Sequence, residues 1–240
     1  MGEDILAIYR RWLKFNPIDE GLVARQQESV VKIAQSGKSR ESALEIGLSA
    51  ISLAEQLILR VEAKNSLPQP IVCRAGCAYC CFTQVVELTP AEALLLGQHV
   101  EQHFSAGEKQ ELLKRVDRNL RLKAGKGKKE AAALRPELPC PLLRQERCSV
   151  YEVRPLLCRA MHSLDAEQCR QDLMCQKVSH FEFYSHRFEI VLSVSAGLAA
   201  GCQAMGCQGR ALDLAGALKD YFAHLSPVDE WLQGKLVFNG

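Results

Sequence analysis

The feature that most constrains this chain is a run of four cysteines within nine residues, CRAGCAYCC, at positions 73–81. The chain has 11 cysteines in 240 residues, and an odd number cannot pair completely within one chain. Closely spaced thiolates are typical of sites for zinc, copper(I) or iron–sulfur clusters, because one short loop then presents several soft sulfur donors. Gly76 permits the tight turn that such a loop needs. The run therefore predicts a metal site rather than scattered core cysteines.

A second cysteine region follows about sixty residues later. Cys140 and Cys148 flank a predicted β-hairpin whose polar turn is RQER, 144–147, and Cys158 lies on a helix predicted within EVRPLLCR. Structural zinc sites are commonly built where a hairpin and the start of a helix meet a cysteine loop. The seven cysteines of the two regions exceed the four ligands of one zinc, and this excess favours two metals or a cluster.

Cys80 and Cys81 are adjacent in the sequence. Consecutive side chains point to opposite faces of a strand, or about 100° apart on a helix, so the two thiols are poorly placed to chelate one ion side by side. Either one of them is structural, or the pair serves two metals or two irons of a cluster.

The strings CRAGCAYCC, CPLL and CSVYEVRPLLCR together resemble the YkgJ family of cysteine-cluster proteins, a group of zinc- or iron-chelating domains. The resemblance covers residues 70–165 and more loosely the helices after them. The first cysteine spacing is three residues where two are usual, and Leu142 stands where an aromatic residue is common. The resemblance implies a metal site built by eight cysteines: Cys73, Cys77, Cys80, Cys81, Cys140, Cys148, Cys158 and Cys169.

The predicted function is that of a metal-binding protein whose cysteine cluster chelates zinc or iron. An iron–sulfur cluster is one form that the bound iron can take. CRAGCAYC is also similar to the radical-SAM signature, in which three thiolates hold a cluster, and flagellin lysine N-methylase resembles YkgJ proteins in its cysteine motif. An iron–sulfur-dependent enzyme of that kind is therefore the alternative function. The radical-SAM barrel needs alternating strands and helices, which this chain does not show. Whether the chain is an enzyme is left open.

Several further residues have two interpretations each. Arg154 and Arg159 flank Cys158, and they either support thiolate sulfurs or pair with carboxylates such as Glu152 or Glu146. His162 lies one helical turn after Cys158, although a hydrogen-bonded histidine is more common at such a position than a ligand. The remaining cysteines are weaker candidates, and a core role is favoured for the last two of them: Cys175, Cys202 and Cys207.

Helical signals dominate the sequence and predict a mainly α fold, with a small irregular cysteine-rich region that contains a short β-hairpin. Asn16 is a candidate N-cap, and Thr89-x-x-Glu92 and Ser105-x-x-Glu108 predict capping boxes for helices ending near residues 103 and 123. The expected organisation is one compact domain made of three parts: a helical N-terminal extension (1–66), a cysteine-cluster metal-binding region (67–177) and C-terminal helices (178–240).

Charge and hydropathy give expectations about partners. Lys plus Arg is 30 against 28 Asp plus Glu, so the whole chain is not drawn to nucleic acid or anionic membrane. The eight basic residues between Lys114 and Lys129 favour a solvated loop over nucleic-acid binding. The uncharged stretch 190–209 contains four glycines and favours a packed helix over a membrane span. With no signal peptide recognised, we expect a cytoplasmic protein that binds metal, with any protein partner unidentified.

Overall fold

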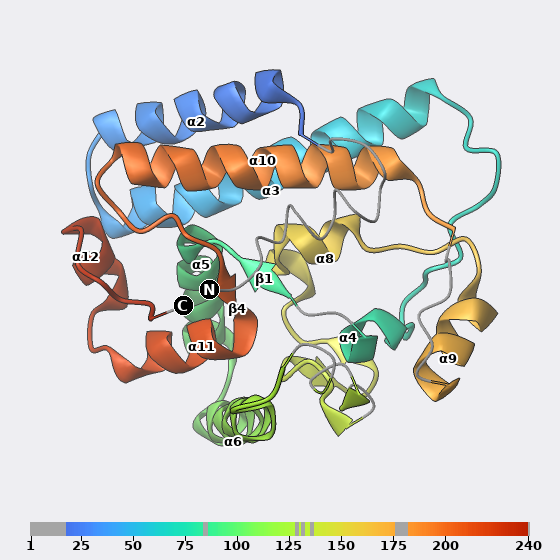
Figure 1. Cartoon of the computed structure of the whole chain (residues 1–240). Helices are drawn as coiled ribbons and strands as arrows, with labels where there is room; N and C mark the ends of the chain where they lie inside the picture. Colours follow the sequence, from blue (N-terminus) through green and yellow to red (C-terminus); the bar gives the residue numbers. More distant parts are fainter. Residues whose placement is uncertain are drawn as a thin grey trace.

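The protein is mainly α-helical, as the sequence predicted (Figure 1). The computed structural model describes residues 18–83, 86–127, 130, 133–134, 137–175 and 182–239. The longer helices are α2 (Glu20–Gln35), α3 (Arg40–Lys64), α5 (Pro90–His103), α6 (Ala106–Lys123), α9 (Ala166–Cys175), α10 (Ser185–Ala204) and α11 (Leu214–Ala223). The shorter elements are α4 (Tyr79–Thr83), β1 (Glu87–Leu88), β2 (Leu143–Arg144), β3 (Arg147–Cys148), the 3₁₀ helix η2 (Tyr151–Val153), α8 (Leu156–Ala160), β4 (Leu212–Asp213) and α12 (Pro227–Leu232). The division of the chain at residues 66 and 177 stays a prediction.

Two capping boxes start α5 and α6 where the sequence predicted them. The Thr89 backbone N–H donates to Glu92 at 2.8 Å, and the Ser105 backbone N–H donates to Glu108 at 2.8 Å. In each case the cap hydroxyl accepts in return from the backbone N–H of the glutamate. Since these bonds satisfy backbone donors that the helix itself cannot, the start of each helix is set locally.

The first described helix begins later than expected. Asp19, not Asn16, is the N-cap of α2, because its Oδ1 accepts from the backbone N–H groups of Gly21 at 2.8 Å and Leu22 at 3.1 Å. Asn16 lies outside the described residues. The Asp19 backbone N–H also donates to Ser193 Oγ of α10 at 2.8 Å, so the cap ties the start of α2 to a distant helix.

Close packing of α10 against α2 depends on two glycines of the uncharged stretch. A Cβ on Gly197 would lie 2.4 Å from the carbonyl oxygen of Val23, and a Cβ on Gly201 would lie 2.5 Å from Val30. The packed-helix interpretation of this stretch agrees with that arrangement. Among the described residues, α3 is the helix that is long and apolar enough to cross a membrane by length and composition, and it packs against α2, α5 and α10.

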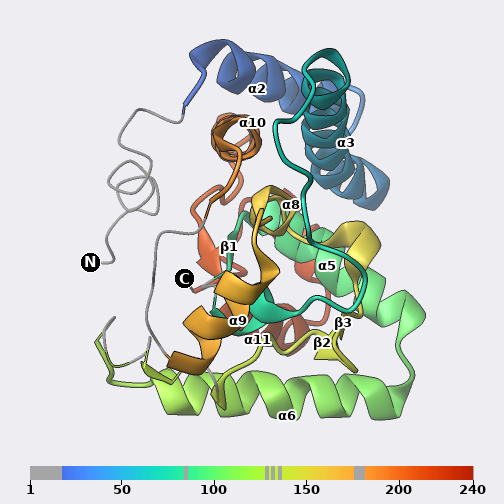
Figure 2. The same cartoon turned by 90° about the vertical axis from the view of Figure 1, so that its right-hand side faces the viewer.

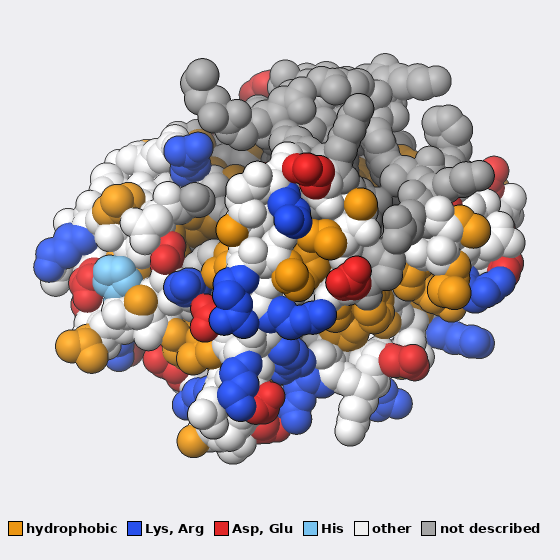
Figure 3. All heavy atoms as spheres, turned by 60° about the horizontal axis from the view of Figure 1, so that its bottom comes forward, with side chains coloured by type: hydrophobic (Ala, Val, Ile, Leu, Met, Phe, Trp, Pro, Cys, Tyr) orange, Lys and Arg blue, Asp and Glu red, His pale blue; other side chains and the backbone are white. Residues whose placement is uncertain are grey.

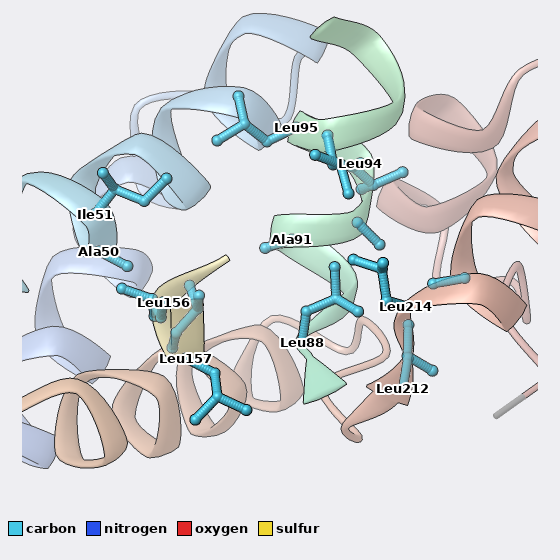
Figure 4. Packing of buried hydrophobic residues seen from close by; sticks show 14 of the residues in the cluster. Ala50, Ile51, Leu88, Ala91, Leu94, Leu95, Leu156, Leu157, Leu212 and Leu214 are labelled. Carbon is cyan, nitrogen blue, oxygen red and sulfur yellow. The ribbon is translucent and has the colours of Figure 1, made fainter. Parts of the chain in front are cut away.

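Beneath the packed helices α2, α3 and α10, the hydrophobic core contains residues from the middle of the chain and from its C-terminal part (Figure 4). Leu88 of β1 pairs with Leu212 of β4 in a short antiparallel ladder, and both side chains are buried. Leu156 and Leu157 of α8 are also buried in this cluster. The cysteine-bearing segments therefore rest on a core that is shared by α3, α5, α10 and α11.

Candidate metal centre

The first cysteine run forms a tight loop followed by the short helix α4. Gly76 has a φ of +89°, which a residue with a side chain rarely adopts, and the Cys77 backbone N–H donates to the Arg74 carbonyl at 2.9 Å. Cys80 and Cys81 are consecutive residues of α4. Cys73 is exposed, whereas the other three thiols of the run are half-buried.

The second cysteine region lies directly against the first. The Cys140 backbone N–H donates to the Cys81 carbonyl at 2.7 Å, across 59 positions of sequence. The predicted hairpin is confirmed: Leu143 of β2 pairs with Cys148 of β3. Its two turn residues, Gln145 and Glu146, have φ values of 49° and 60°, which is the backbone of a two-residue type I′ turn. The loop and the hairpin therefore meet through their backbones.

Cys158 is positioned by a buried carboxylate that sequence analysis had assigned only to a helix cap. Glu92 accepts from the Thr89 backbone and hydroxyl at the start of α5, and its other oxygen accepts from the Leu156 backbone N–H at 2.7 Å. Leu156 is the first residue of α8, the helix that carries Cys158. One glutamate thus fixes two helix starts, and only the three-dimensional contact could reveal the second.

Cys169 reaches the site because α9 packs against α4, and the two helices lie side by side in Figures 1 and 2. The Val72 backbone N–H donates to the Ser163 carbonyl at 3.1 Å, which ties the start of the cysteine loop to the segment before α9. Ser163 Oγ accepts from the Asp165 backbone at 3.0 Å and shapes that segment. Cys175, at the other end of α9, is exposed.

Burial raises the pKa values of several of these thiols, and the charges of other cysteines raise them further. Burial is the main cause for the pKa of Cys73, raised to about 11, and for the pKa of Cys140, raised to about 12, with charges on nearby cysteines adding to both. A hydrogen bond with Cys81, followed by burial, raises the pKa of Cys80 well above its usual range. The charge of Cys80 also raises the pKa values of thiols in both cysteine regions, among them Cys158 and Cys169. Cys80 is thus electrostatically coupled to thiols of both cysteine regions, which no sequence spacing indicated.

Residues 72–176 match one family model, CxxCxxCC, described as "Putative zinc- or iron-chelating domain". This segment is similar to a CxxCxxCC domain. The domain includes every cysteine of the predicted site, from Cys73 to Cys169. Searches of curated proteins and of solved structures return no significant match. The narrower YkgJ label stays a prediction, and so does the assignment of individual ligands.

The donor chemistry of the CxxCxxCC domain fits zinc or iron. All 11 cysteines are free, and those of the domain present soft sulfur donors that neighbour one another. As ionised thiolates they would repel, and a bound cation removes that repulsion. In the described part of the chain, no three His, Cys, Asp or Glu side chains are already arranged to hold a metal ion.

The two arginines beside Cys158 have partners different from those predicted. Arg159 is buried and pairs with Glu55 of α3, and its guanidinium also donates to the Glu152 and Arg154 carbonyls. Arg154 stacks on the Tyr151 ring, 3.8 Å from its centroid. Neither pairs with the carboxylates of Glu152 or Glu146 in the described contacts. Both charges lower the pKa of Cys148, against the larger effect of burial. The predicted support of thiolate sulfurs by these arginines stays a prediction.

Three weaker candidates lie apart from the cluster. His162 is buried with both ring nitrogens in use: Nδ1 contacts the Ala160 carbonyl at 2.7 Å, and Nε2 accepts from the Tyr184 backbone N–H at 2.8 Å. It therefore acts as a structural histidine. Cys202 and Cys207 are buried at the end of α10, in agreement with the core role favoured for them.

The basic residues of α6 hold the second cysteine region. Figure 3 shows Lys and Arg side chains gathered on the face that includes α6. Arg115 donates to the Leu143 carbonyl and Arg118 to the Glu137 carbonyl, both at 2.8 Å. The charge of Arg115 also lowers the pKa of Cys140, against burial. Arg115 is thus a neighbour of the site that the sequence analysis missed, because it had been assigned to a solvated segment.

Proposed function

We propose that this protein binds zinc or iron through the thiolates of its CxxCxxCC domain and that the bound metal is structural rather than catalytic. The observation that supports this best is the convergence of cysteines from separate segments around α4. The ligands in this proposal are the eight predicted cysteines: Cys73, Cys77, Cys80, Cys81, Cys140, Cys148, Cys158 and Cys169.

The surroundings of these thiols support metal binding over a role as ordinary core cysteines. Cys202 and Cys207 are buried within the hydrophobic core, as ordinary core cysteines are. The eight cysteines of the proposed site instead come from a loop, a hairpin and the helices α4, α8 and α9, and their residues are exposed or half-buried. Bound zinc or iron would neutralise the thiolates and cross-link the loop, the hairpin and α8. The proposal requires reduced thiols, which a cytoplasmic location maintains.

An iron–sulfur-dependent enzyme, resembling flagellin lysine N-methylase, remains the alternative function. The spacing of Cys73, Cys77 and Cys80, with Tyr79 before the third, is the feature that favours it. The described residues contain only two-residue strands, which do not make the alternating barrel of radical-SAM enzymes. We therefore favour structural metal binding over the iron–sulfur enzyme. The identity of the bound metal distinguishes these two functions.

Anaerobic purification, followed by metal analysis and a visible spectrum, tests the proposal. We expect zinc or iron to copurify with the protein and a chelator to lower its melting temperature, because a metal that binds only the folded state stabilises it. Broad absorption toward the blue would indicate an iron–sulfur cluster, and a colourless zinc protein would indicate a structural site.

The matched variants are a double change, Cys80→Ser with Cys81→Ser, and a control, Cys175→Ser. The double change should reduce metal content, whereas the control should not, since Cys175 is exposed at the far end of α9. Reduced wild-type protein that binds neither zinc nor iron when both are supplied would refute the proposed function.

A further inference from the structure

We propose that the exposed face of α6, together with the β2–β3 hairpin, binds the phosphate backbone of a nucleic-acid duplex without reading its sequence. We call this surface the basic strip, and it consists of five cations: Lys114, Arg118, Arg121, Arg144 and Arg147. The strip lies beside the second cysteine region, but its binding to phosphate does not require a bound metal. The inference therefore goes beyond the proposed function and stands independently of it.

Three cations of the strip follow one face of α6. Lys114, Arg118 and Arg121 are spaced by four and three residues, which places them on the same side of a helix, and all three are exposed. The opposite side of the helix is buried through Leu112 and Val116. The sequence favoured a solvated loop for this segment, whereas the structure shows that its first part is helical. At the rise of an α-helix the three cations span about 10 Å.

The hairpin adds two arginines at directly opposed positions. Arg144 of β2 pairs with Arg147 of β3, and both residues are exposed. Like charges in a cross-strand pair destabilise a sheet. The hairpin lies against α6 because Arg115 donates to the Leu143 carbonyl at 2.8 Å, and burial followed by the charge of Arg144 lowers the pKa of Arg115. An anion bound across helix and hairpin would relieve this repulsion.

Ion pairs within the protein neutralise only part of the strip. Glu111 pairs with Lys114 at 2.7 Å, and Glu108 pairs with Arg144 at 2.6 Å. In the described part of the chain, the other guanidinium groups of the strip have no carboxylate partner: Arg118, Arg121 and Arg147. Guanidinium groups match phosphate oxygens with paired N–H donors. Figure 3 shows Lys and Arg side chains gathered on this face, although the net charge of the whole chain is only +2.

The lack of apolar anchors favours nucleic acid over a protein or a membrane as the partner. Protein interfaces depend on buried aromatic or aliphatic side chains, and the exposed large hydrophobic side chains of the described residues lie outside α6 and the hairpin strands. A helix that binds a bilayer inserts an apolar face, and α6 buries its apolar face inside the protein.

The form of nucleic acid follows from the residues of the strip. The strip contains no aromatic residue on which unpaired bases could stack, which disfavours a single strand. A duplex carries about one phosphate charge per 1.7 Å of its length, so several phosphates face a strip of this size. Duplex DNA and duplex RNA share this backbone chemistry, and the experiment distinguishes them.

Fluorescence anisotropy of the reduced full-length protein with labelled duplexes of about 20 base pairs tests the inference. We expect micromolar affinity at about 50 mM salt, and a slope of log K against log salt between about −3 and −4, because each neutralised phosphate contributes about −0.9. Two unrelated sequences should bind equally well, since phosphate contacts carry no sequence information. Comparison of a DNA with an RNA duplex identifies which of the two binds more tightly.

Matched triple variants locate the contact. The strip variant combines Lys114→Gln, Arg121→Gln and Arg147→Gln, none of which donates to the backbone of the cysteine region in the described contacts. It should lower the magnitude of the salt slope by about 3, or about 1 for each residue, and weaken binding about tenfold or more. The control variant removes as many exposed positive charges from α2 and α3, on the far side of the molecule from α6 (Figure 1), and should bind like the wild type: Arg25→Gln, Arg60→Gln and Lys64→Gln.

One further variant gives a result that misfolding cannot produce. Glu146→Gln removes the carboxylate of the hairpin turn and should strengthen duplex binding. The inference is wrong if neither duplex binds at low salt, or if the control variant loses as much affinity as the strip variant. Tighter binding of polyglutamate or of phosphatidylserine vesicles than of the duplexes would also overturn it, in favour of an acidic protein or a membrane. Metal content is measured separately, so these results leave the proposed function standing.

Discussion

Replacing Glu92 by Gln tests whether the buried carboxylate positions α8, the helix that carries Cys158. The side chain is 3% exposed, and one oxygen accepts from the Thr89 backbone and hydroxyl at 2.8 and 2.9 Å. Its other oxygen accepts from the Leu156 backbone N–H at 2.7 Å. Glutamine keeps the size of the side chain but has only one acceptor oxygen. Whichever way the amide turns, its NH₂ group faces a donor.

The expected cost follows from that mismatch. A buried donor left without an acceptor costs about 1–3 kcal/mol. Burial raises the pKa of Glu92, so the neutral amide recovers part of the desolvation cost of the carboxylate. We therefore expect Glu92→Gln to lower the free energy of unfolding by about 2 kcal/mol, or roughly 30-fold in the folding equilibrium. Since α8 carries Cys158, bound metal should also leave faster when α8 is loosened.

The capping box of α6 supplies a matched control. Glu108 accepts from Ser105 with nearly the same geometry, but it is only half-buried, and its other oxygen accepts from Arg144 of β2 at 2.6 Å in a partly exposed ion pair instead of holding the start of a second helix. A partly exposed ion pair of this kind contributes about 0–1 kcal/mol. Urea titration of both variants should give a clearly smaller loss for Glu108→Gln, with unchanged m-values in both. Equal losses in the two variants, or no loss for Glu92→Gln, would refute the positioning role.

Two further predictions concern packing and pH. Gly197→Ala should lower the free energy of unfolding by about 1–3 kcal/mol, because the added Cβ would collide with the Val23 carbonyl. The control Gly107→Ala places its Cβ in open space and should not destabilise the protein. Thermal melts of the two variants compare these effects. Burial lowers the pKa of His162 to about 4, so its unfolded form takes up a proton first as pH falls. The contribution of neutral His162 to the free energy of unfolding is therefore complete above about pH 6.5. It falls by about 2 kcal/mol as the pH is lowered toward 4, after allowance for solvent screening. NMR measures the pH at which the His162 ring takes up its proton in the folded protein, and a midpoint near pH 6.5 would contradict this prediction.

Local signals in the sequence predicted much of the helical framework. Capping boxes at Thr89 and Ser105 gave the starts of α5 and α6 because their bonds join residues only three positions apart. The hairpin between Cys140 and Cys148 was also predictable, although its turn uses two non-glycine residues with positive φ. The start of α2 was placed wrongly, since two polar residues there, Asn16 and Asp19, are both suitable caps.

Sequence spacing could not predict the neighbours of the site. Arg159 was predicted either to support thiolate sulfurs or to pair with a nearby carboxylate, and the carboxylate with which it pairs, Glu55, lies on α3, 104 positions away. Arg115 was assigned to a solvated segment, and Glu92 to a cap alone. Each of these contacts forms only when helices pack, and no local pattern carries that information.

By itself, the sequence determined the chemistry: the number of soft sulfur donors, their spacing in one loop and a hairpin, and the helical starts. These depend on residue type and on bonds between near neighbours along the chain. Tertiary structure decided which cysteine-bearing segments meet, that Glu92 also holds the start of α8, and that Arg115 contacts the hairpin. Those relations are set by packing around a shared core, where residues far apart in sequence come into contact.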